Sequence, residues 1–450
     1  MPVKLLLIGA GLRGKDAYGA WIAKNPQRAT LLGVAEPDLA RLAEVSITHR
    51  IPPEGQFRDW RELLAAGIRA DACLVCTQDD QHVAPALMAL AAGYDVLLEK
   101  PMALNPADCR RLVEAAESSG RRLRVCHVLR YTEFFATVKS TLDSGVLGRI
   151  VHINHSENVS WYHFAHSFVR GNWRSEATSS PFVLAKTCHD LDLLFWLAGE
   201  EPEWVHSFGQ RSFFRSENAP TGATPHCGGC PHSSNCLWYA PKLYRRGEDL
   251  LSLPQRSRNP LLRAASRLAV ATVRARSPNY QWKGWPTSAT TNDLTPAGVE
   301  RALASGPYGR CVFACDNDAP DHQLVSLQFP SGLTATLTVT GLSDKEGRTL
   351  RIEGSEATLH GSFATAGQEL EVHEHRTGKR RKVFRRGFHI GDHGGGDAGL
   401  MDDFIASYDA SRSGLPELAS GRASLTSHLM AFAADRSRKE NRVVSLKEFL

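Results

Sequence analysis

Apolar runs alternate with amphipathic stretches over the first 126 residues of this chain. The runs have the length of strands, and the stretches between them have the apolar spacing of helices. Strand-like runs lie at 5–8, 30–35, 71–76, 94–98 and 123–126, and helix-like stretches at 84–92 and 106–119. Regular alternation of strand and helix is typical of a parallel sheet covered by helices. We therefore expect residues 1–126 to form an α/β domain with a doubly wound parallel sheet.

The pattern changes after residue 126. One helix-like segment precedes stretches in which apolar and polar residues alternate, at 150–160, 204–211, 322–329, 333–339, 349–353 and 369–373. Such alternation is typical of antiparallel strands with one solvated face. Amphipathic helices are expected at 399–411 and 421–438, either on that sheet or returning to the first domain. We expect residues 127–450 to form an α+β domain with an open, mostly antiparallel sheet.

Three segments of the second half depart from this pattern. Residues from about 215 to 315 are rich in Gly, Pro, Ser and Arg, and we interpret them as an insertion with a helix-prone piece at 260–277. The basic stretch 376–386 indicates a solvated hairpin or edge strand, with anion binding as the alternative. The glycine-rich segment 391–397 predicts a loop that lies close to another backbone or to a ligand.

Composition narrows the functional class. The 450 residues are 42% hydrophobic and carry a formal net charge of +5, which fits two globular domains and does not indicate nucleic acid. No apolar run approaches the roughly 18 residues of a membrane helix. Met1 leads almost directly into the first strand, so we expect no signal peptide, no membrane contact and a cytoplasmic location. The ten cysteines are then expected to be reduced.

The first strand runs into the turn Gly9-Ala10-Gly11-Leu12-Arg13-Gly14, which is typical of a dinucleotide site. Gly9 permits a tight turn, Gly11 lets the backbone approach a pyrophosphate, and Gly14 lets helix and strand pack closely. Glu36 ends the second strand, where an acid accepts the ribose hydroxyls and repels a 2′-phosphate. This favours NAD, while Arg13 leaves NADP as the alternative. The predicted contacts are Gly9, Gly11, Leu12, Arg13, Gly14 and Glu36.

The insertion carries cysteines at metal-ligand spacing. Cys227, Cys230 and Cys236 are followed downstream by Cys311 and Cys315. Four thiolates suit zinc, which would fasten a loop-rich insertion that lacks a core. We predict a structural zinc site at Cys227, Cys230, Cys236 and Cys311, with Cys315 as the alternative fourth ligand and His226 or His232 behind them. An iron–sulfur cluster and free thiols are the other interpretations.

The order of three motifs resembles the Gfo/Idh/MocA family of oxidoreductases. The motifs are the glycine turn, Glu99-Lys100-Pro101 at a strand end, and the segment 188–197, which begins Cys-His-Asp-Leu-Asp. The resemblance covers nearly the whole chain outside the insertion. It implies a Rossmann domain, a substrate and oligomerisation domain, a nicotinamide cofactor, a sugar or cyclitol substrate, and a homo-oligomer, dimer or tetramer.

Lys100 and His189 are the main catalytic candidates. Oxidation of a secondary alcohol needs a group that takes the hydroxyl proton, and Lys100 lies where ligands bind in parallel sheets. The resemblance implies that His189 binds the same hydroxyl. Family members commonly have Asp four residues before this His, but here Ala185 stands there, and Lys186 follows it. We expect Lys186 to share the substrate hydroxyls, and Asp192 to orient His189.

Further contacts are expected from neighbouring strand ends. Thr77 and His82 match the family's Thr-x-x-x-x-His pattern and, with Glu99 and Lys100, are predicted to line the cofactor path; Thr77 as a simple turn cap is the alternative. The other predicted substrate contacts are His127, Arg130, Trp161, Tyr162, Trp173, Arg174 and, in the glycine-rich loop, His393. For Trp161, Tyr162, Trp173 and Arg174, a role in the core or in an interface is an equally good interpretation.

The leading hypothesis is an NAD(P)-dependent dehydrogenase of a sugar, cyclitol or sugar derivative. A second hypothesis keeps the fold and recycles the cofactor, so that a transient keto-sugar allows elimination or cleavage of a glycosidic bond. A third is a sensor that binds dinucleotide and a protein without catalysis. The presence of both Lys100 and His189 argues against the third hypothesis.

Overall fold

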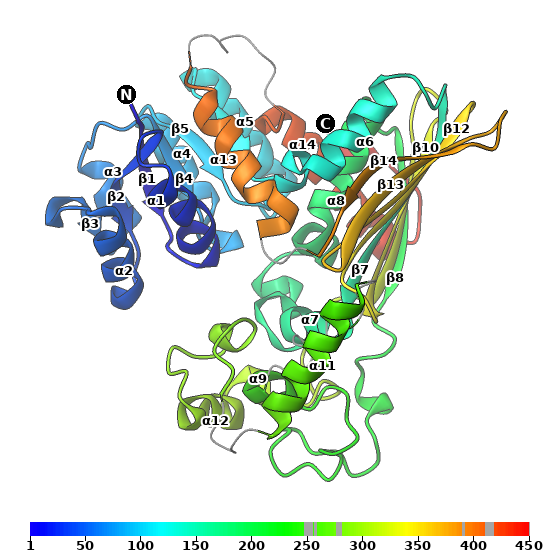
Figure 1. The fold of residues 1–450 in the computed structure, drawn as a ribbon. Helices are drawn as coiled ribbons and strands as arrows, with labels where there is room; N and C mark the ends of the chain where they lie inside the picture. The colour runs from blue at the N-terminus through cyan, green and yellow to red at the C-terminus, as the bar shows by residue number, and fades with distance from the viewer. Residues whose placement is uncertain (247–254, 256–258, 276–280, 389–391, 410–417, 450) are drawn as a thin grey trace.

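The computed structural model describes residues 1–450 except 247–254, 256–258, 276–280, 389–391, 410–417 and 450. A six-stranded sheet occupies the N-terminal part, and a nine-stranded sheet occupies the second part (Figure 1). The predicted fold class, a doubly wound parallel sheet followed by an α+β part, is confirmed. Within the described ranges, no helix is both long and apolar enough to cross a membrane.

The first sheet is parallel throughout and has the order β3-β2-β1-β4-β5-β6. Its strands are β1 (Val3–Ile8), β2 (Ala29–Ala35), β3 (Gln56–Phe57), β4 (Ala72–Val75), β5 (Asp95–Leu98) and β6 (Leu123–Val125). Every residue of β4, β5 and β6 is buried, as expected for a sheet covered on both faces. Sequence analysis missed β3, because two residues are too short for a hydrophobic pattern.

Helices cover both faces of this sheet. They include α1 (Ala20–Lys24), α2 (Leu39–His49), α3 (Trp60–Ala65), α4 (Val83–Ala91) and α5 (Pro106–Ser119). Buried side chains of α3, α4 and α5 join one hydrophobic cluster, whereas those of α1 and α2 join a second. Helix α13 (Gly396–Ala406), far along the chain, also belongs to the second cluster. The end of the chain therefore returns to the first sheet.

The second sheet has the order β14-β13-β12-β11-β7-β10-β9-β8-β15. Strands β7 and β10 are parallel, and the other neighbouring pairs are antiparallel. The strands are β7 (Ile150–Ser160), β8 (Trp204–Gln210), β9 (His322–Gln328), β10 (Thr334–Ser343), β11 (Gly347–Gly354), β12 (Ala357–Ala364), β13 (Gly367–Glu374), β14 (Arg380–Arg386) and β15 (Val444–Ser445). The basic stretch forms the edge strand β14, as predicted, whereas β12 and β15 were missed.

One face of the second sheet packs against helices. These are α6 (Glu133–Asp143), α8 (Phe182–Ala198) and α14 (Gly421–Glu440) (Figure 1). On β8 and β9, Phe208 and Leu324 are register partners and both are exposed. The homo-oligomer that the resemblance implies, a dimer or tetramer, stays a prediction.

The insertion forms helices α9 (Ala240–Arg246), α11 (Pro260–Ala275) and α12 (Pro296–Ser305). It also has a small core, in which Tyr162 and Cys227 pack with residues of α9 and α12. The structural metal was predicted on the premise that the insertion lacks a core. That premise is wrong, because the insertion has this small core. Among the described residues, no group of three or more His, Cys, Asp or Glu could hold a metal ion.

The predicted ligands Cys227, Cys230, Cys236, Cys311 and Cys315 all lie within the described residues, so neither zinc nor an iron–sulfur cluster is supported there. Cys227 is buried instead against protein donors. Its Sγ lies 3.6 Å from Nη2 of the buried Arg170 and accepts a hydrogen bond of 3.5 Å from the Ala240 amide. The five cysteines are free thiols in this structure.

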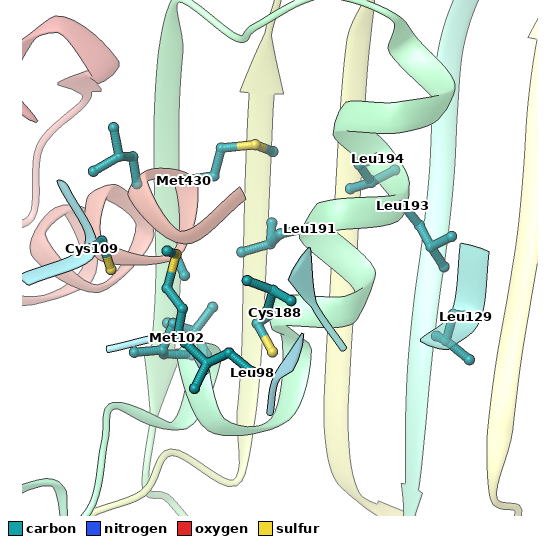
Figure 2. Packing of buried hydrophobic residues seen from close by; sticks show 14 of the residues in the cluster. Leu98, Met102, Cys109, Leu129, Cys188, Leu191, Leu193, Leu194 and Met430 are labelled. Carbon is teal, nitrogen blue, oxygen red and sulfur yellow. The ribbon is translucent and has the colours of Figure 1, made fainter. Parts of the chain in front are cut away.

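A single hydrophobic cluster connects the two sheets (Figure 2). Leu98 ends β5, Cys188 and Leu191 lie on α8, and Met430 lies on α14. Met102, just after β5, packs in the same cluster and is fully buried. The strand end that carries Lys100 is therefore held in the same core as α8, which carries His189.

Removing side-chain volume at this junction should destabilise the whole chain. Leu191 is 0% exposed, so Leu191→Ala leaves a cavity and should lower the free energy of unfolding by about 3 kcal/mol. Urea denaturation followed by circular dichroism measures this change. Leu261→Ala on α11 is the matched control, because Leu261 is 77% exposed and its change should stay below about 0.5 kcal/mol. Equal effects of the two variants would contradict the connected core.

Candidate active site

The glycine-rich turn joins β1 to the helical turn η1 (Leu12–Gly19). Gly9 has a φ of +89°, and a Cβ there would lie 2.6 Å from the Cys76 carbonyl oxygen. A Cβ on Gly14 would lie 2.0 Å from the Gly9 carbonyl oxygen. At Gly11, no described atom lies within 4 Å of where a Cβ would be. Gly9 and Gly14 are thus required by packing, and the open side of Gly11 suits the close approach of a pyrophosphate.

Glu36 follows β2 and is nearly buried, at 4% exposed. Its Oε2 accepts a hydrogen bond of 2.7 Å from the Ala10 amide, and its Oε1 accepts one of 3.0 Å from the Asp38 amide. These bonds fix the carboxylate beside the glycine turn. This is the position from which an acid binds the adenosine ribose in such sheets.

Arg13 is engaged by carboxylates of the protein itself. Its Nε donates to Glu99 at 2.6 Å, and its Nη1 and Nη2 donate to Asp397 at 3.0 and 2.7 Å. Tyr18 accepts from the same guanidinium and donates to Glu99. Burial alone would raise the pKa of Glu99, but Arg13 and Tyr18 outweigh it and hold that pKa below its ordinary value. The guanidinium is thus neutralised within the protein.

Thr77 and His82 lie at the end of β4 and before α4. Thr77 donates to the Gln81 carbonyl at 3.0 Å, a contact that caps the turn, and its place on the cofactor path stays a prediction. His82 is buried, and its Nδ1 lies 2.6 Å from the Pro101 carbonyl oxygen. The structure therefore directs His82 to the turn after β5.

Lys100 follows β5, and the Lys100–Pro101 bond is cis. Its Nζ donates to the Ala185 carbonyl oxygen on α8 at 3.1 Å. Ala185 lies one helical turn before His189, so the two sheets bring Lys100 and His189 to one place. Burial and the charge of Lys100 lower the pKa of His189 well below its ordinary value. His189 is therefore neutral at physiological pH, and its Nδ1 has no hydrogen-bond partner among the described residues.

Two other imidazoles lie beside His189. The ring centroids of His127 and His393 are 5.7 and 6.2 Å from that of His189. Burial lowers the pKa of His127 well below its ordinary value. His393 has a φ of +49° and pairs through Nδ1 with Asp397 at 3.1 Å. The glycine-rich loop thus reaches the site through His393, and Arg13 shares its carboxylate Asp397.

Arg130 and Asp192 neutralise each other in the wall next to this group. Nε and Nη2 of Arg130 donate to the two carboxylate oxygens of Asp192 at 2.6 and 2.7 Å. His127 lies 3.7 Å from the same carboxylate. Asp192 therefore holds Arg130 and faces His127, rather than pairing with His189.

Lys186 belongs to a separate buried network beneath α8. Its Nζ pairs with Glu157 of β7 at 2.9 Å and lies 3.8 Å from Glu346. Burial would lower the pKa of Lys186, but these two carboxylates raise it above its ordinary value. Lys186 is therefore protonated and held toward the sheet, and the structure does not place it with Lys100.

The aromatic stretch is divided. Tyr162 is buried in the small core of the insertion, and Trp161 contacts it edge-on with ring centroids 5.6 Å apart. Trp173 donates to Asp79 at 3.0 Å, linking the second part of the chain to the turn after β4. Arg174 pairs with Asp316 at 3.1 Å. Trp161, Tyr162 and Arg174 thus have structural partners, and Trp173 joins the two halves.

Sequence analysis missed Tyr18, Asp397 and His428. Asp397 had a signal, because it ends the glycine-rich segment that predicted a loop close to another backbone or to a ligand. Tyr18 and His428 lie inside helical segments and have no motif around them. Each has one partner that is distant in sequence, Glu99 for Tyr18 and Met102 for His428.

Comparisons with known proteins bear on the family and the fold. A model described as an oxidoreductase family with an NAD-binding Rossmann fold matches residues 3–127, and a model of the GFO/IDH/MocA C-terminal domain matches residues 135–224. The Bacillus subtilis protein YteT is 24% identical over 94% of this chain and 90% of its own length. Inositol 2-dehydrogenase 4 of Saccharopolyspora erythraea is 31% identical over 48% of this chain and 60% of its own length.

Solved structures share the fold at lower identity. An oxidoreductase from Agrobacterium radiobacter, in complex with NAD+, L-tartaric acid and magnesium, has a TM-score of 0.67 at 17% identity and covers 100% of both chains. The WlbA dehydrogenase from Bordetella pertussis, in complex with NADH and UDP-GlcNAcA, has a TM-score of 0.61 at 18% identity and covers 99% of both chains.

The buried ion pair between Asp190 of α8 and Arg348 of β11 gives a pH-dependent prediction. Nε of Arg348 and Nε2 of His155 each lie 2.7 Å from the Asp190 carboxylate. Arg348 and His155 hold the pKa of Asp190 well below its ordinary 3.8, although burial alone would raise it. The ionised carboxylate therefore stabilises the fold above pH 3.8, and this contribution is lost as the pH falls toward the lowered pKa. Asp190→Asn leaves Arg348 without its full counter-charge and should lower the free energy of unfolding at pH 7 by about 3 kcal/mol.

Urea denaturation at pH 7 and at about pH 3 measures both effects. The loss of stability on acidification should be smaller in Asp190→Asn than in the wild type. The control is Asp143→Asn, whose exposed pair with Lys139 should matter by less than about 0.5 kcal/mol. Wild-type stability and pH dependence in Asp190→Asn would refute the assignment.

Proposed function

Because the chain belongs to the Gfo/Idh/MocA family of oxidoreductases, we propose that it transfers a hydride between a nicotinamide dinucleotide and a secondary hydroxyl of a sugar, cyclitol or sugar derivative. The observation that carries the proposal is the meeting of Lys100 and the neutral His189 beside the glycine turn. Inositol 2-dehydrogenases among the relatives, and a trans-1,2-dihydrobenzene-1,2-diol dehydrogenase of Bos taurus, support a ring or diol substrate.

The residues around the turn fit a dinucleotide. Gly11 leaves room for a pyrophosphate, and Glu36 is fixed where the ribose hydroxyls would lie. When bound, the nicotinamide supplies the hydride acceptor or donor. Arg13 of this turn pairs with both Glu99 and Asp397, so the turn is linked to the residue that precedes Lys100.

Lys100 handles the proton of the substrate hydroxyl in this proposal. Within the described residues, its Nζ has one hydrogen bond, to a backbone carbonyl, so it can turn toward a hydroxyl without breaking an ion pair there. The free Nδ1 of His189 accepts or donates a hydrogen bond at the same hydroxyl. His127 and His393 border the substrate, and Lys186 contributes by holding Glu157 beneath α8. General acid–base catalysis of this kind contributes about 10²–10⁴-fold to the rate.

We further propose that NAD is preferred over NADP. Glu36 would repel a 2′-phosphate, and Arg13 is already paired with Glu99 and Asp397. Glu36→Gln removes the charge and should narrow the ratio of the NADP+ and NAD+ dissociation constants by about tenfold. Fluorescence titration measures both constants. Asp59→Asn, which keeps a helix N-cap at α3, is the control and should leave the ratio unchanged. An unchanged ratio in Glu36→Gln would remove Glu36 from cofactor selection.

A substrate panel tests the reaction itself. The protein is incubated with NAD+ and a mixture of cyclitols, sugars and glycosides, and the products are identified by mass spectrometry. We expect a product lighter by two hydrogens. Lys100→Ala should lower kcat by at least about 100-fold while the affinity for NADH is kept, because the proton-handling group is lost. Lys139→Ala on α6 is the matched control and should retain kcat.

Other results of the panel would favour redox-neutral glycoside cleavage or the non-catalytic sensor. A released aglycone without loss of two hydrogens would replace the dehydrogenase with redox-neutral cleavage of a glycoside. An unchanged panel would contradict both reactions. Near-normal activity of Lys100→Ala would remove Lys100 from the mechanism.

A further inference from the structure

The turn that carries Lys100 is held by histidines from two distant parts of the chain. His82, before α4, lies with Nδ1 at 2.6 Å from the Pro101 carbonyl oxygen. His428, on α14, lies with Nε2 at 2.9 Å from the Met102 amide nitrogen. Pro101 directly follows Lys100, and the Pro101 carbonyl and the Met102 amide belong to the same peptide bond. The two histidines therefore contact consecutive backbone groups of the turn, on the C-terminal side of Lys100.

The contacts of His428 determine its tautomer. Its Nδ1 lies 2.7 Å from the Ser424 carbonyl oxygen, which can only accept a hydrogen bond. Its Nε2 faces the Met102 amide, which can only donate. The proton must therefore reside on Nδ1, and Nε2 must present a lone pair. A protonated imidazole would place two N–H groups against each other at Met102.

The surroundings keep His428 neutral. The side chain is fully buried, and burial together with His127 lowers the pKa of His428 to about 3. The His127 ring lies edge-on to it, with centroids 5.6 Å apart. Met102 and Met430 pack in the cluster that also holds α8 (Figure 2). Buried amides pay a large desolvation cost when they lose their partner, so the Met102 amide depends on His428.

We propose that His428 is a positioning residue, which fixes the turn at Met102 and thereby aims Lys100 at the substrate. The expected effect on kcat rests on the proposed function. The hydrogen bond between His428 and the Met102 amide rests on the contacts alone. It gives α14 a role in catalysis, although α14 lies more than 300 residues beyond Lys100 in the chain. The residue does not touch the reacting atoms in this assignment.

Two variants at position 428 separate the hydrogen bond from the packing. His428→Leu fills the space and removes the acceptor, whereas His428→Gln offers an amide oxygen to Met102. His428→Leu should lower kcat by about 10- to 100-fold, because a small displacement of a catalytic group is costly. The dissociation constant of NADH should stay within about twofold, and His428→Gln should recover most of kcat.

The route through Lys100 is tested in a second background. If His428 acts by aiming Lys100, His428→Leu should change kcat of Lys100→Ala by less than about twofold. Ser437→Ala is the matched control on α14: Ser437 is equally buried and accepts a hydrogen bond from the Ser207 amide, far from the turn. It should lower the melting temperature without lowering kcat.

Hydrogen–deuterium exchange of the peptide containing Met102 provides a readout that needs no substrate. The Met102 amide should exchange at least about tenfold faster in His428→Leu than in the wild type or Ser437→Ala. Unchanged exchange would overturn the hydrogen bond between His428 and the Met102 amide. Faster exchange with normal kcat, or a further loss of kcat in the Lys100→Ala background, would overturn the positioning role. If the wild type converts no panel substrate, the proposed function fails and the exchange result still decides this hydrogen bond.

Discussion

The hydrophobic cluster around Leu98, Leu191 and Met430 joins the parallel sheet to the second sheet, and the site depends on it. Lys100 comes from the first sheet, whereas His189 comes from α8 on the second. Neither sheet alone forms the pair. Close packing across the cluster fixes their relative position, because interiors of this density do not deform without losing contacts.

Electrostatics divides the buried charges into two kinds. Arg13, Arg130, Arg348 and Lys186 each have a carboxylate within 3 Å, so they contribute structure at limited desolvation cost. Lys100 donates instead to the backbone carbonyl of Ala185. His127 and His189 are neutral because burial disfavours their charged form.

Local patterns predicted most of the framework. Strands β1, β2 and β7 and the edge strand β14 follow from runs or alternation that need no knowledge of their partners. The two-residue β3 was missed because it exists only through pairing with β2. The cysteine spacing was misleading, because a C-x-x-C loop also fits a packed insertion whose buried Cys227 faces Arg170.

The sequence by itself determined the dinucleotide turn, the strand end at Lys100 and the helix that carries His189, since each depends on residues that are neighbours in the chain. Only the tertiary structure decided which of these groups meet. In the folded chain Lys186 pairs with Glu157, Arg13 pairs with Asp397, and His428 accepts a hydrogen bond from the Met102 amide. Such contacts join residues separated by up to several hundred positions, and hydrophobic periodicity carries no information about side-chain partners at that separation.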